Sequence, residues 1–261
     1  MMLHVEDLSI EFHDHIIPET VVYDFDLDME EGEIVGLVGE SGSGKSMSAL
    51  AIAGLLNRHD SSKRGKIMFG DIDILNCPRE VLRSLQGDEI SMVFQEPMTS
   101  LNPVKKIGWQ VEEALRIHTD MDKVQRKQRA LEVLADVELD DPERVYNSYP
   151  HQLSGGMRQR VMIAAAMVNT PKLLIADEPT TALDVTVQGQ IVKLLKRINK
   201  TKGTAILFIS HDLSLVRQLC DRVLVMKGGY IVDGGNTEDI FNNPRQDYTK
   251  KLINAIPKVE L

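Results

Sequence analysis

A glycine-rich segment that directly follows a short apolar run constrains the fold of this chain more than any other feature. Residues Ile34–Val38 are continuously apolar, as in central strands that are covered on both faces. Residues Gly39–Ser46 then fit the pattern G-x-x-x-x-G-K-[ST], and an apolar helical pattern runs from Ser46 to Leu56. A strand, a loop and a helix in this order predict an α/β core in which loop N–H groups and a helix N-terminus converge on a phosphate group.

Composition places the chain among globular proteins. Its 261 residues, 43% of them hydrophobic, suffice for one large domain or a core with a subdomain. We expect neither secretion nor a membrane span, because the N-terminus lacks the regions of a signal peptide and no run of about eighteen apolar residues occurs. A net charge of −9 disfavours nucleic acid as a partner. Cys77 and Cys220 lie far apart and are interpreted as packing residues.

The order of apolar patterns predicts several kinds of structure along the chain. Alternating apolar residues from Leu3 to Met29 indicate a half-buried antiparallel sheet. From 101 to 170 the pattern is helical and more polar, which indicates an inserted helical subdomain. Strand-like runs over 173–176 and 204–209, with an amphipathic helix over 187–199 between them, predict a parallel sheet. A hairpin is expected over 223–232, and a short helix with a tail over 236–261. The apolar stripes of the helical insert are Ile107, Val111 and Leu115, and Val124, Leu131 and Leu134.

The glycine-rich loop supplies most of the candidate ligands for a phosphate chain. Lys45 adds a point charge near the β- and γ-phosphates, and the hydroxyl of Ser46 suits Mg²⁺. The alternative is a glycine-rich turn that matches by chance, and the flanking strand and helix argue against it. The candidate residues are Gly39, Glu40, Ser41, Gly42, Ser43, Gly44, Lys45, Ser46 and Met47.

A second apolar strand, over 173–176, ends in the two acids Asp177 and Glu178. Ligands of open α/β sheets bind at the carboxyl ends of the strands. Asp177 is therefore predicted to lie on the metal side and to act through water. Glu178 lies one residue further toward the γ-phosphate and is the better candidate for polarising the attacking water. A strand that ends in solvated acids is the weaker interpretation, because a phosphate loop is present in the same chain.

The segment Leu153–Met157, Leu-Ser-Gly-Gly-Met, predicts a second anion site. Ser154 stands at the expected N-cap of an apolar helix, and Gly155 and Gly156 leave backbone N–H groups uncovered. A glycine-containing helix start without a ligand is the alternative. Together with the phosphate loop, this segment resembles the nucleotide-binding subunits of ATP-binding cassette (ABC) transporters.

That resemblance covers residues 3–257 and implies the fold. It implies an α/β fold with a P-loop NTPase (RecA-like) core, an N-terminal antiparallel β subdomain and an inserted α-helical subdomain. Within one domain over 1–261, we expect the core with its β subdomain over 1–97 and 171–235. The helical subdomain is expected over 98–170 and a C-terminal tail over 236–261.

The family resemblance also assigns roles at the predicted site. Its pattern is matched in order by Gln95, Asp184 and His211. The resemblance implies ATP and Mg²⁺ as cofactors, with Glu178, His211 and Gln95 as catalytic residues. His211 would hydrogen-bond the γ-phosphate, and Gln95 would contact the metal or water. The expected metal ligands are Ser46, Gln95 and Asp177.

Further positions are expected to bind nucleotide through the base or across a dimer. Phe12 resembles the aromatic residue that stacks on adenine, with packing in its strand as the alternative. Ser154, Gly155, Gly156 and Asp184 would serve the ATP of a second subunit. ATP would then be bound between two chains and would hold the dimer together until hydrolysis lets the chains separate.

Longer segments resemble the oligopeptide and dipeptide importer branch, with nickel importers as a variant: residues 95–103, 149–160, 176–186 and 243–252. This implies an ATP-hydrolysing subunit at the cytoplasmic face of a bacterial cell membrane. Its expected partners are two transmembrane permease subunits and, indirectly, an extracytoplasmic solute-binding protein. Met157 resembles the first of two distinct ATPase subunits, which implies a paralogous partner, although an identical one stays open. Some relatives continue into a cysteine-rich segment that binds an iron–sulfur cluster, and no cluster is expected here because the sequence stops at Leu261 without those cysteines.

Two other classes of function compete with a transporter subunit. A soluble ABC ATPase that acts on nucleic acid or ribosomes would usually carry a coiled-coil insertion or a second cassette, and neither is present. A small phosphotransferase would have no reason to carry Leu153–Met157. His13–Asp14–His15 is interpreted as a solvated turn rather than a metal site, and Trp109 as a packing residue of the helical insert.

Overall fold

The chain is divided into two compact units in a computed structural model that describes residues 1–13, 18–56, 61–95, 100–181 and 183–256. The first unit comprises Met1–Leu82 and Ala205–Leu261, and the second comprises Arg83–Thr204. The helix α2 (Arg79–Leu85) contains the point at which the chain passes from one to the other.

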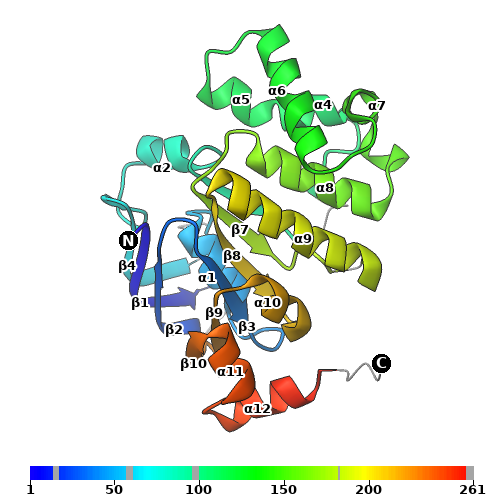
Figure 1. Cartoon of the computed structure of the whole chain (residues 1–261). Helices are drawn as coiled ribbons and strands as arrows, with labels where there is room; N and C mark the ends of the chain where they lie inside the picture. The colour runs from blue at the N-terminus through cyan, green and yellow to red at the C-terminus, as the bar shows by residue number, and fades with distance from the viewer. Residues whose placement is uncertain (14–17, 57–60, 96–99, 182, 257–261) are drawn as a thin grey trace. The chain divides into compact units, whose positions relative to one another are not determined.

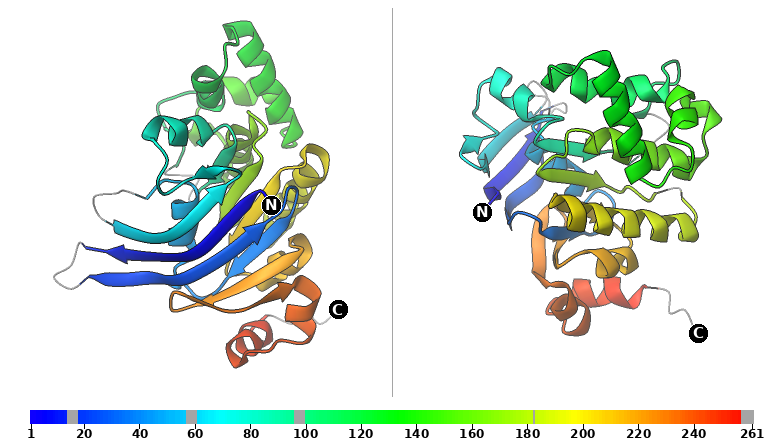
Figure 2. Two further views of the ribbon diagram at one scale, coloured as in Figure 1. Left: turned by 90° about the vertical axis from the view of Figure 1, so that its left-hand side faces the viewer. Right: turned by 45° about the horizontal axis from the view of Figure 1, so that its top comes forward.

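The first unit contains an antiparallel sheet with the strand order β2-β1-β4-β5. These strands are β1 (Leu3–Phe12), β2 (Glu19–Met29), β4 (Ser61–Phe69) and β5 (Ile72–Asp73). The long strands β1, β2 and β4 lie side by side in the left view of Figure 2. Leu3, Val5, Leu8 and Ile10 are buried, which confirms the predicted half-buried sheet.

A second, mostly parallel group of strands in the same unit has the order β10-β9-β3-β8. It consists of β3 (Ile34–Val38), β8 (Ala205–Ser210), β9 (Arg222–Lys227) and β10 (Tyr230–Asn236). β3 pairs in parallel with both β8 and β9, while β9 and β10 form an antiparallel hairpin. Every residue of β3 and β8 is buried, as the continuous apolar runs predict.

Among the described residues of the first unit, helices that accompany these strands include α1 (Lys45–Ile52), α10 (Leu213–Leu219), α11 (Thr237–Asn242) and α12 (Asp247–Asn254) (Figure 1). The helix after the glycine-rich loop ends at Ile52, before the predicted Leu56. Gly54 has a φ of 67°, and the N–H of Leu55 donates to the carbonyl of Leu50. The helix ends here because the chain turns into the left-handed conformation. Glycine adopts that conformation without the strain that a Cβ atom would cause.

The second unit places two parallel strands, β6 (Ile90–Val93) and β7 (Leu173–Asp177), beside a group of helices. The helices are α4 (Ile107–Val111), α5 (Glu113–His118), α6 (Lys123–Asp136), α7 (Pro142–Asn147), α8 (Gly155–Met167) and α9 (Val185–Lys202), with a 3₁₀ turn over Pro150–Gln152. The α/β fold with an antiparallel β subdomain and a helical insert is therefore confirmed.

Two details of the helical prediction need correction. Val124 is 77% exposed, whereas α6 buries Ala130, Val133 and Leu134. The apolar stripe starts later because Val124 lies in the first turn, two residues after the capping residue Asp122. Helix α9 extends beyond 187–199 at both ends, from the N-cap Asp184 to the left-handed Gly203.

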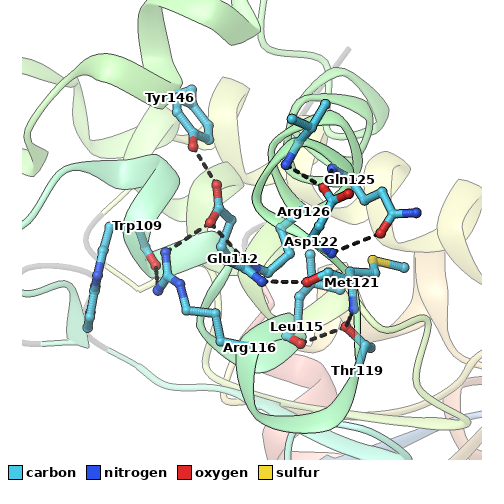
Figure 3. Close-up of polar contacts among 11 residues, drawn as sticks. Trp109, Glu112, Leu115, Arg116, Thr119, Met121, Asp122, Gln125, Arg126 and Tyr146 are labelled. Carbon is cyan, nitrogen blue, oxygen red and sulfur yellow. Dashed lines mark hydrogen bonds and ion pairs between the residues drawn. The ribbon is translucent and has the colours of Figure 1, made fainter.

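Figure 3 shows a buried acidic residue among the helices of the second unit. Glu112 is 3% exposed and accepts hydrogen bonds from the Tyr146 hydroxyl and, at 2.9 Å, from the Arg116 guanidinium. Arg116 also donates to the carbonyl oxygen of Trp109 at 2.9 Å. The Trp109 ring is 41% exposed and lies near the cationic groups of Lys105 and Arg116, so it packs at the edge of the helices rather than inside them.

Candidate functional site

The phosphate loop of the first unit leaves the end of β3 in a conformation that only glycine adopts readily. Gly39 has a φ of 152°, and a Cβ atom at this position would lie 2.1 Å from the carbonyl oxygen of Met226. Gly44, the N-cap of α1, has a φ of 103°, and a Cβ there would lie 2.8 Å from the Val21 carbonyl oxygen. The N–H of Gly229 donates to the carbonyl of Ser43 at 3.0 Å. The loop is thus packed against β2 and the β9–β10 hairpin, with no room for side chains at these two glycines.

Lys45 is buried in this loop, with 5% of the residue exposed. Its Nζ atom donates to the carbonyl oxygens of Gly39 at 2.9 Å and Glu40 at 2.8 Å, and to the Ser43 hydroxyl at 3.4 Å. All three acceptors are neutral. An anionic phosphate oxygen is a stronger partner for an ammonium group, so the site is suited to exchange these bonds for a phosphate ligand.

His211 and Phe12 also lie in the first unit. In the parallel pairing of β3 with β8, Val38 lies opposite Ser210, so Gly39 and His211 leave the same edge of the sheet. His211 is exposed, and Asp212 after it caps α10 by accepting a hydrogen bond from the Ser214 N–H at 2.8 Å. Phe12 ends β1 opposite Glu19 and Ser61 and is partly exposed. Its role in stacking on a base stays a prediction.

The predicted acids and glutamine meet in the second unit. Val93 of β6 lies opposite Ala176 of β7, and Gln95 and Glu178 follow each of them by two residues. Gln95 Nε2 donates to the Glu178 carboxylate at 2.9 Å. Asp177 ends β7 and is 6% exposed. The strand ends thus bring together a buried acid, a partly exposed acid and an amide.

Glu178 has an unusual backbone and a second hydrogen-bond donor. Its φ is 46°, a left-handed conformation that is uncommon for a residue with a side chain. The Thr181 hydroxyl donates to the same carboxylate oxygen at 2.9 Å. Two donors therefore fix the orientation of the carboxylate. The sequence predicted no role for Thr181, although its place three residues after Glu178 in a turn would allow this hydrogen bond to be anticipated.

The Leu153–Met157 segment forms the exposed start of a buried helix in the second unit. Ser154 caps α8 by accepting a hydrogen bond from the Met157 N–H at 3.3 Å, which confirms its predicted position. Ser154 and Gly155 are exposed, whereas most of the helix behind them is buried. A Cβ atom on Gly156 would lie 2.9 Å from Val187 of α9.

Asp184 lies close to this helix start. Its side chain accepts a hydrogen bond from the Val187 N–H at 2.9 Å and so caps α9. A Cβ atom on Gly155 would lie 3.7 Å from Leu183, the residue before Asp184. The starts of α8 and α9 are therefore neighbours, and all four residues predicted to act on a second chain belong to them.

The donor atoms predicted for a metal are of the kind that Mg²⁺ prefers. A hydroxyl, a carboxylate and an amide oxygen are hard oxygen ligands, so Ser46, Asp177 and Gln95 fit this ion by chemistry. No cluster of three or more His, Cys, Asp or Glu residues suited to a metal occurs in the described ranges. Of His13–Asp14–His15, the last two residues lie outside those ranges. The helices of the described segments include none long and apolar enough to cross a membrane.

Comparison with known proteins assigns the chain to a protein family. The family profile described as ABC transporter matches residues 22–181. This range includes the phosphate loop, Leu153–Met157 and the Asp177–Glu178 pair.

Two curated relatives align over nearly all of the chain. The dipeptide transport ATP-binding protein DppD of Escherichia coli is 45% identical over 257 residues, which cover 98% of this chain and 79% of the relative. The peptidoglycan transport ATP-binding protein YejF of Agrobacterium fabrum is 49% identical over 260 residues, 99% of this chain. The chain spans 48% of the length of that second relative.

Solved structures of similar fold come from nucleotide-binding cassettes. A dimeric, post-hydrolysis state of an ATP-binding cassette bound to ADP and Pi has a TM-score of 0.81 and 31% sequence identity, over 90% of this chain and 99% of that one. Part of the ABC transporter complex cbiONQ of Clostridium perfringens has a TM-score of 0.77 and 28% identity, over 93% and 91% of the two chains.

Proposed function

Because this chain belongs to the ABC transporter family, we propose that it is the ATP-hydrolysing subunit of a membrane importer for dipeptides or oligopeptides. The observation that carries the proposal is the Glu178 carboxylate, held by Gln95 and Thr181 at the end of β7. A carboxylate fixed in this way is suited to accept a proton from water, which is the step that ATP hydrolysis requires.

In the proposed reaction, residues 39–47 bind the phosphate chain through backbone N–H groups and the Lys45 ammonium. Bound Mg²⁺ would neutralise charge on the phosphates, with Ser46, Gln95 and Asp177 as its ligands. Glu178 orients and deprotonates the attacking water, and His211 donates a hydrogen bond to the γ-phosphate. Phe12 packs against the base.

The active form is proposed to be a dimer of two cassettes. Ser154 and Gly155 are exposed at the start of α8, Gly156 follows them, and Leu183 next to Asp184 lies beside Gly155. These residues would contact the ATP bound to the phosphate loop of the other chain. The dimeric state of the ADP-bound cassette described above supports this arrangement. The predicted division into core, helical subdomain and C-terminal tail is kept as part of this proposal.

The imported solute and the partners are proposed from the relatives. DppD is a dipeptide transport protein, and an oligopeptide transport ATP-binding protein OppD of Lactococcus lactis is 42% identical over 99% of this chain. We propose two permease subunits, a paralogous or identical ATPase subunit and an extracytoplasmic binding protein as partners. The chain would then work at the cytoplasmic face of the membrane. The net charge of −9 disfavours the alternative of an ATPase that acts on nucleic acid.

Replacing Glu178 by Gln tests the proposed chemistry. The amide keeps the size of the side chain but accepts no proton, so we expect ATP hydrolysis to fall at least about 100-fold, in the range of a lost general base. ATP binding should be retained, and ATP-dependent dimers should accumulate because turnover no longer releases them. Steady-state hydrolysis and size-exclusion chromatography with and without ATP measure the two effects.

The matched control is Lys45→Ala, which should lose ATP binding as well as hydrolysis. If Glu178→Gln keeps most of the hydrolysis, the base lies elsewhere. If Lys45→Ala keeps its affinity for ATP, the phosphate-loop assignment is wrong. Peptide transport is tested separately by co-expression with the permease subunits and binding protein of a dipeptide importer, where labelled dipeptide uptake should depend on Lys45.

A further inference from the structure

One peptide group of the phosphate loop is held at both of its ends by side chains of the first unit. The carbonyl oxygen of Gly39 accepts a hydrogen bond from Lys45 Nζ at 2.9 Å. The N–H of the same peptide group belongs to Glu40 and donates to the hydroxyl oxygen of Tyr248 at 3.1 Å. The two bonds together set the rotation of the Gly39–Glu40 peptide plane.

This peptide needs external restraint because Gly39 supplies none. Glycine populates positive φ as readily as negative φ, so its backbone loses more freedom than any other residue when it is ordered. At a φ of 152°, Gly39 adopts a conformation that only glycine takes up without strain. Hydrogen bonds from elsewhere must therefore fix the orientation of the peptide that follows.

Tyr248 is itself firmly placed on α12, near the C-terminal end of the described chain (Figure 1). The next residue, Thr249, is fully buried, and its hydroxyl donates to Asp233 Oδ2 at 2.8 Å. The same oxygen accepts from the Gln246 N–H at 3.2 Å. Asp233 of β10 thus anchors the start of α12.

The ring and hydroxyl of Tyr248 are also constrained. Lys227 Nζ lies over the ring, 4.9 Å from its centre. Burial raises the pKa of the Tyr248 hydroxyl above its ordinary value of 10.0, so the group stays neutral near pH 7. A neutral hydroxyl accepts the Glu40 N–H without adding a negative charge beside a phosphate site.

We propose that Tyr248 is a positioning residue for nucleotide binding, which holds the Gly39–Glu40 peptide while Lys45 exchanges the Gly39 carbonyl for a phosphate oxygen. This inference rests on the proposed function, because it needs Lys45 to bind phosphate. Once Lys45 has moved, the Tyr248 hydroxyl keeps the N–H end of the peptide in place. The C-terminal helix α12 thereby sets how well the loop is organised for its ligand.

The test is Tyr248→Phe in the full chain, which removes the hydroxyl and keeps the ring. We expect the Kd for ATP to rise about three- to tenfold, the range of one lost neutral hydrogen bond. Pyrophosphate should be affected by the same factor, because Tyr248 acts on the phosphate loop and not on the base. The matched control is Tyr230→Phe, another tyrosine of the first unit, which is 48% exposed and stacks on Tyr23. It should bind both ligands as the wild type does.

A double-mutant cycle with Thr249→Val connects the effect to the anchor of α12. Thr249→Val removes the donor to Asp233, so it should also weaken pyrophosphate binding. Adding Tyr248→Phe to it should cause less further loss than Tyr248→Phe causes alone, because both act through one hydrogen bond. Full additivity of the two effects would contradict the proposed route. Thr249→Val alone gives a second measurement of the effect if Tyr248→Phe folds poorly.

Three results would overturn the inference. The first is an unchanged Kd for ATP and pyrophosphate in Tyr248→Phe, and the second is a loss for ATP alone, which would place Tyr248 at the base. The third is a wild type without measurable affinity for either ligand, equal to Lys45→Ala, which would overturn the proposed function as well. In the first two, Lys45→Ala still loses binding and the proposed function stands.

Discussion

Glu112 brings a carboxylate into the interior of the second unit, where a charge is costly unless it is paired. Only 3% of the residue is exposed, and its oxygens accept hydrogen bonds from Tyr146 and Arg116. Removing one partner of a buried charge leaves part of its desolvation uncompensated. Because Glu112 joins α4 to α5 and Tyr146 belongs to α7, this cluster links three short helices (Figure 3).

Tyr146→Phe should therefore destabilise the protein by about 1.5–3 kcal/mol at neutral pH, the cost of a lost hydrogen bond to a charged group. Burial, followed by the hydrogen bond to Glu112, raises the pKa of Tyr146 from 10.0 to about 12. A group whose pKa is raised on folding contributes its full stabilisation below its pKa in the unfolded chain. That stabilisation is lost as the pH rises through its pKa in the folded chain. The stability difference between wild type and Tyr146→Phe should shrink between pH 10 and about 12. Denaturant unfolding at several pH values measures it, with Tyr230→Phe as the control; a constant difference would exclude this coupling.

Helices α8 and α9 both begin at a side chain that faces solvent. Ser154 caps α8 and Asp184 caps α9, while Val161, Ile163 and Ile191 behind them are fully buried. A cap stabilises the helix start whether or not the uncovered N–H groups have a ligand. The structural and the proposed binding role of such a residue can therefore be separated by comparison with a cap elsewhere.

Ser154→Ala and Asp122→Ala form such a pair, because Asp122 caps α6 through the N–H groups of Val124 and Gln125. Each variant should lose about 1 kcal/mol of unfolding free energy. In a Glu178→Gln background, only Ser154→Ala should also weaken ATP-dependent dimerisation. Denaturant unfolding and analytical ultracentrifugation give the two quantities. Equal dimerisation in both variants would remove Ser154 from the proposed interface.

The sequence predicts where helices start, but it does not predict how deeply each helix turn is buried in the core. Ser154 is predictable as a cap because capping joins residues only three positions apart. Val124 shows the limit, since the helical period gives its face but not the point along α6 at which packing begins. The end of α1 at Ile52, two residues before the left-handed Gly54, was missed because apolar residues continue past it.

At the scale of the whole molecule, the predicted nucleotide ligands are shared between the two compact units. The loop from Gly39 to Met47 belongs to the first unit, together with Phe12 and His211, and Asp177 belongs to the second. A ligand that binds only the folded chain stabilises it, and each residue that contacts the ligand adds to that stabilisation.

ATP with Mg²⁺ should therefore raise the unfolding temperature more than ATP with a chelator. At about 100 times its Kd, a ligand contributes about 2.7 kcal/mol, which amounts to several degrees for a chain of this size. Asp177→Asn should abolish the part that depends on Mg²⁺ and keep the part that ATP gives alone. Asp71→Asn, an exposed turn residue, is the control. A metal-dependent shift that survives in Asp177→Asn would assign the metal to other ligands.

Contacts between residues far apart in the chain were the hardest to predict from the sequence. The Gln95–Glu178 hydrogen bond spans 83 positions and could be anticipated only as two strand ends on one edge. The contact of Tyr248 with Glu40 spans 208 positions, and no local pattern indicates it. Such a pair follows from how β10 and α12 pack, which depends on Asp233 and Thr249 rather than on a motif.

The left-handed backbone of Glu178 affects which residues selection would favour at this position. Glycine, asparagine or aspartate would occupy that conformation at a lower cost than glutamate. In a laboratory selection for heat resistance alone, replacements at Glu178 would therefore be enriched, whereas growth that requires the chemistry would restore the acid. At position 178, stability and ATP turnover therefore favour different residues.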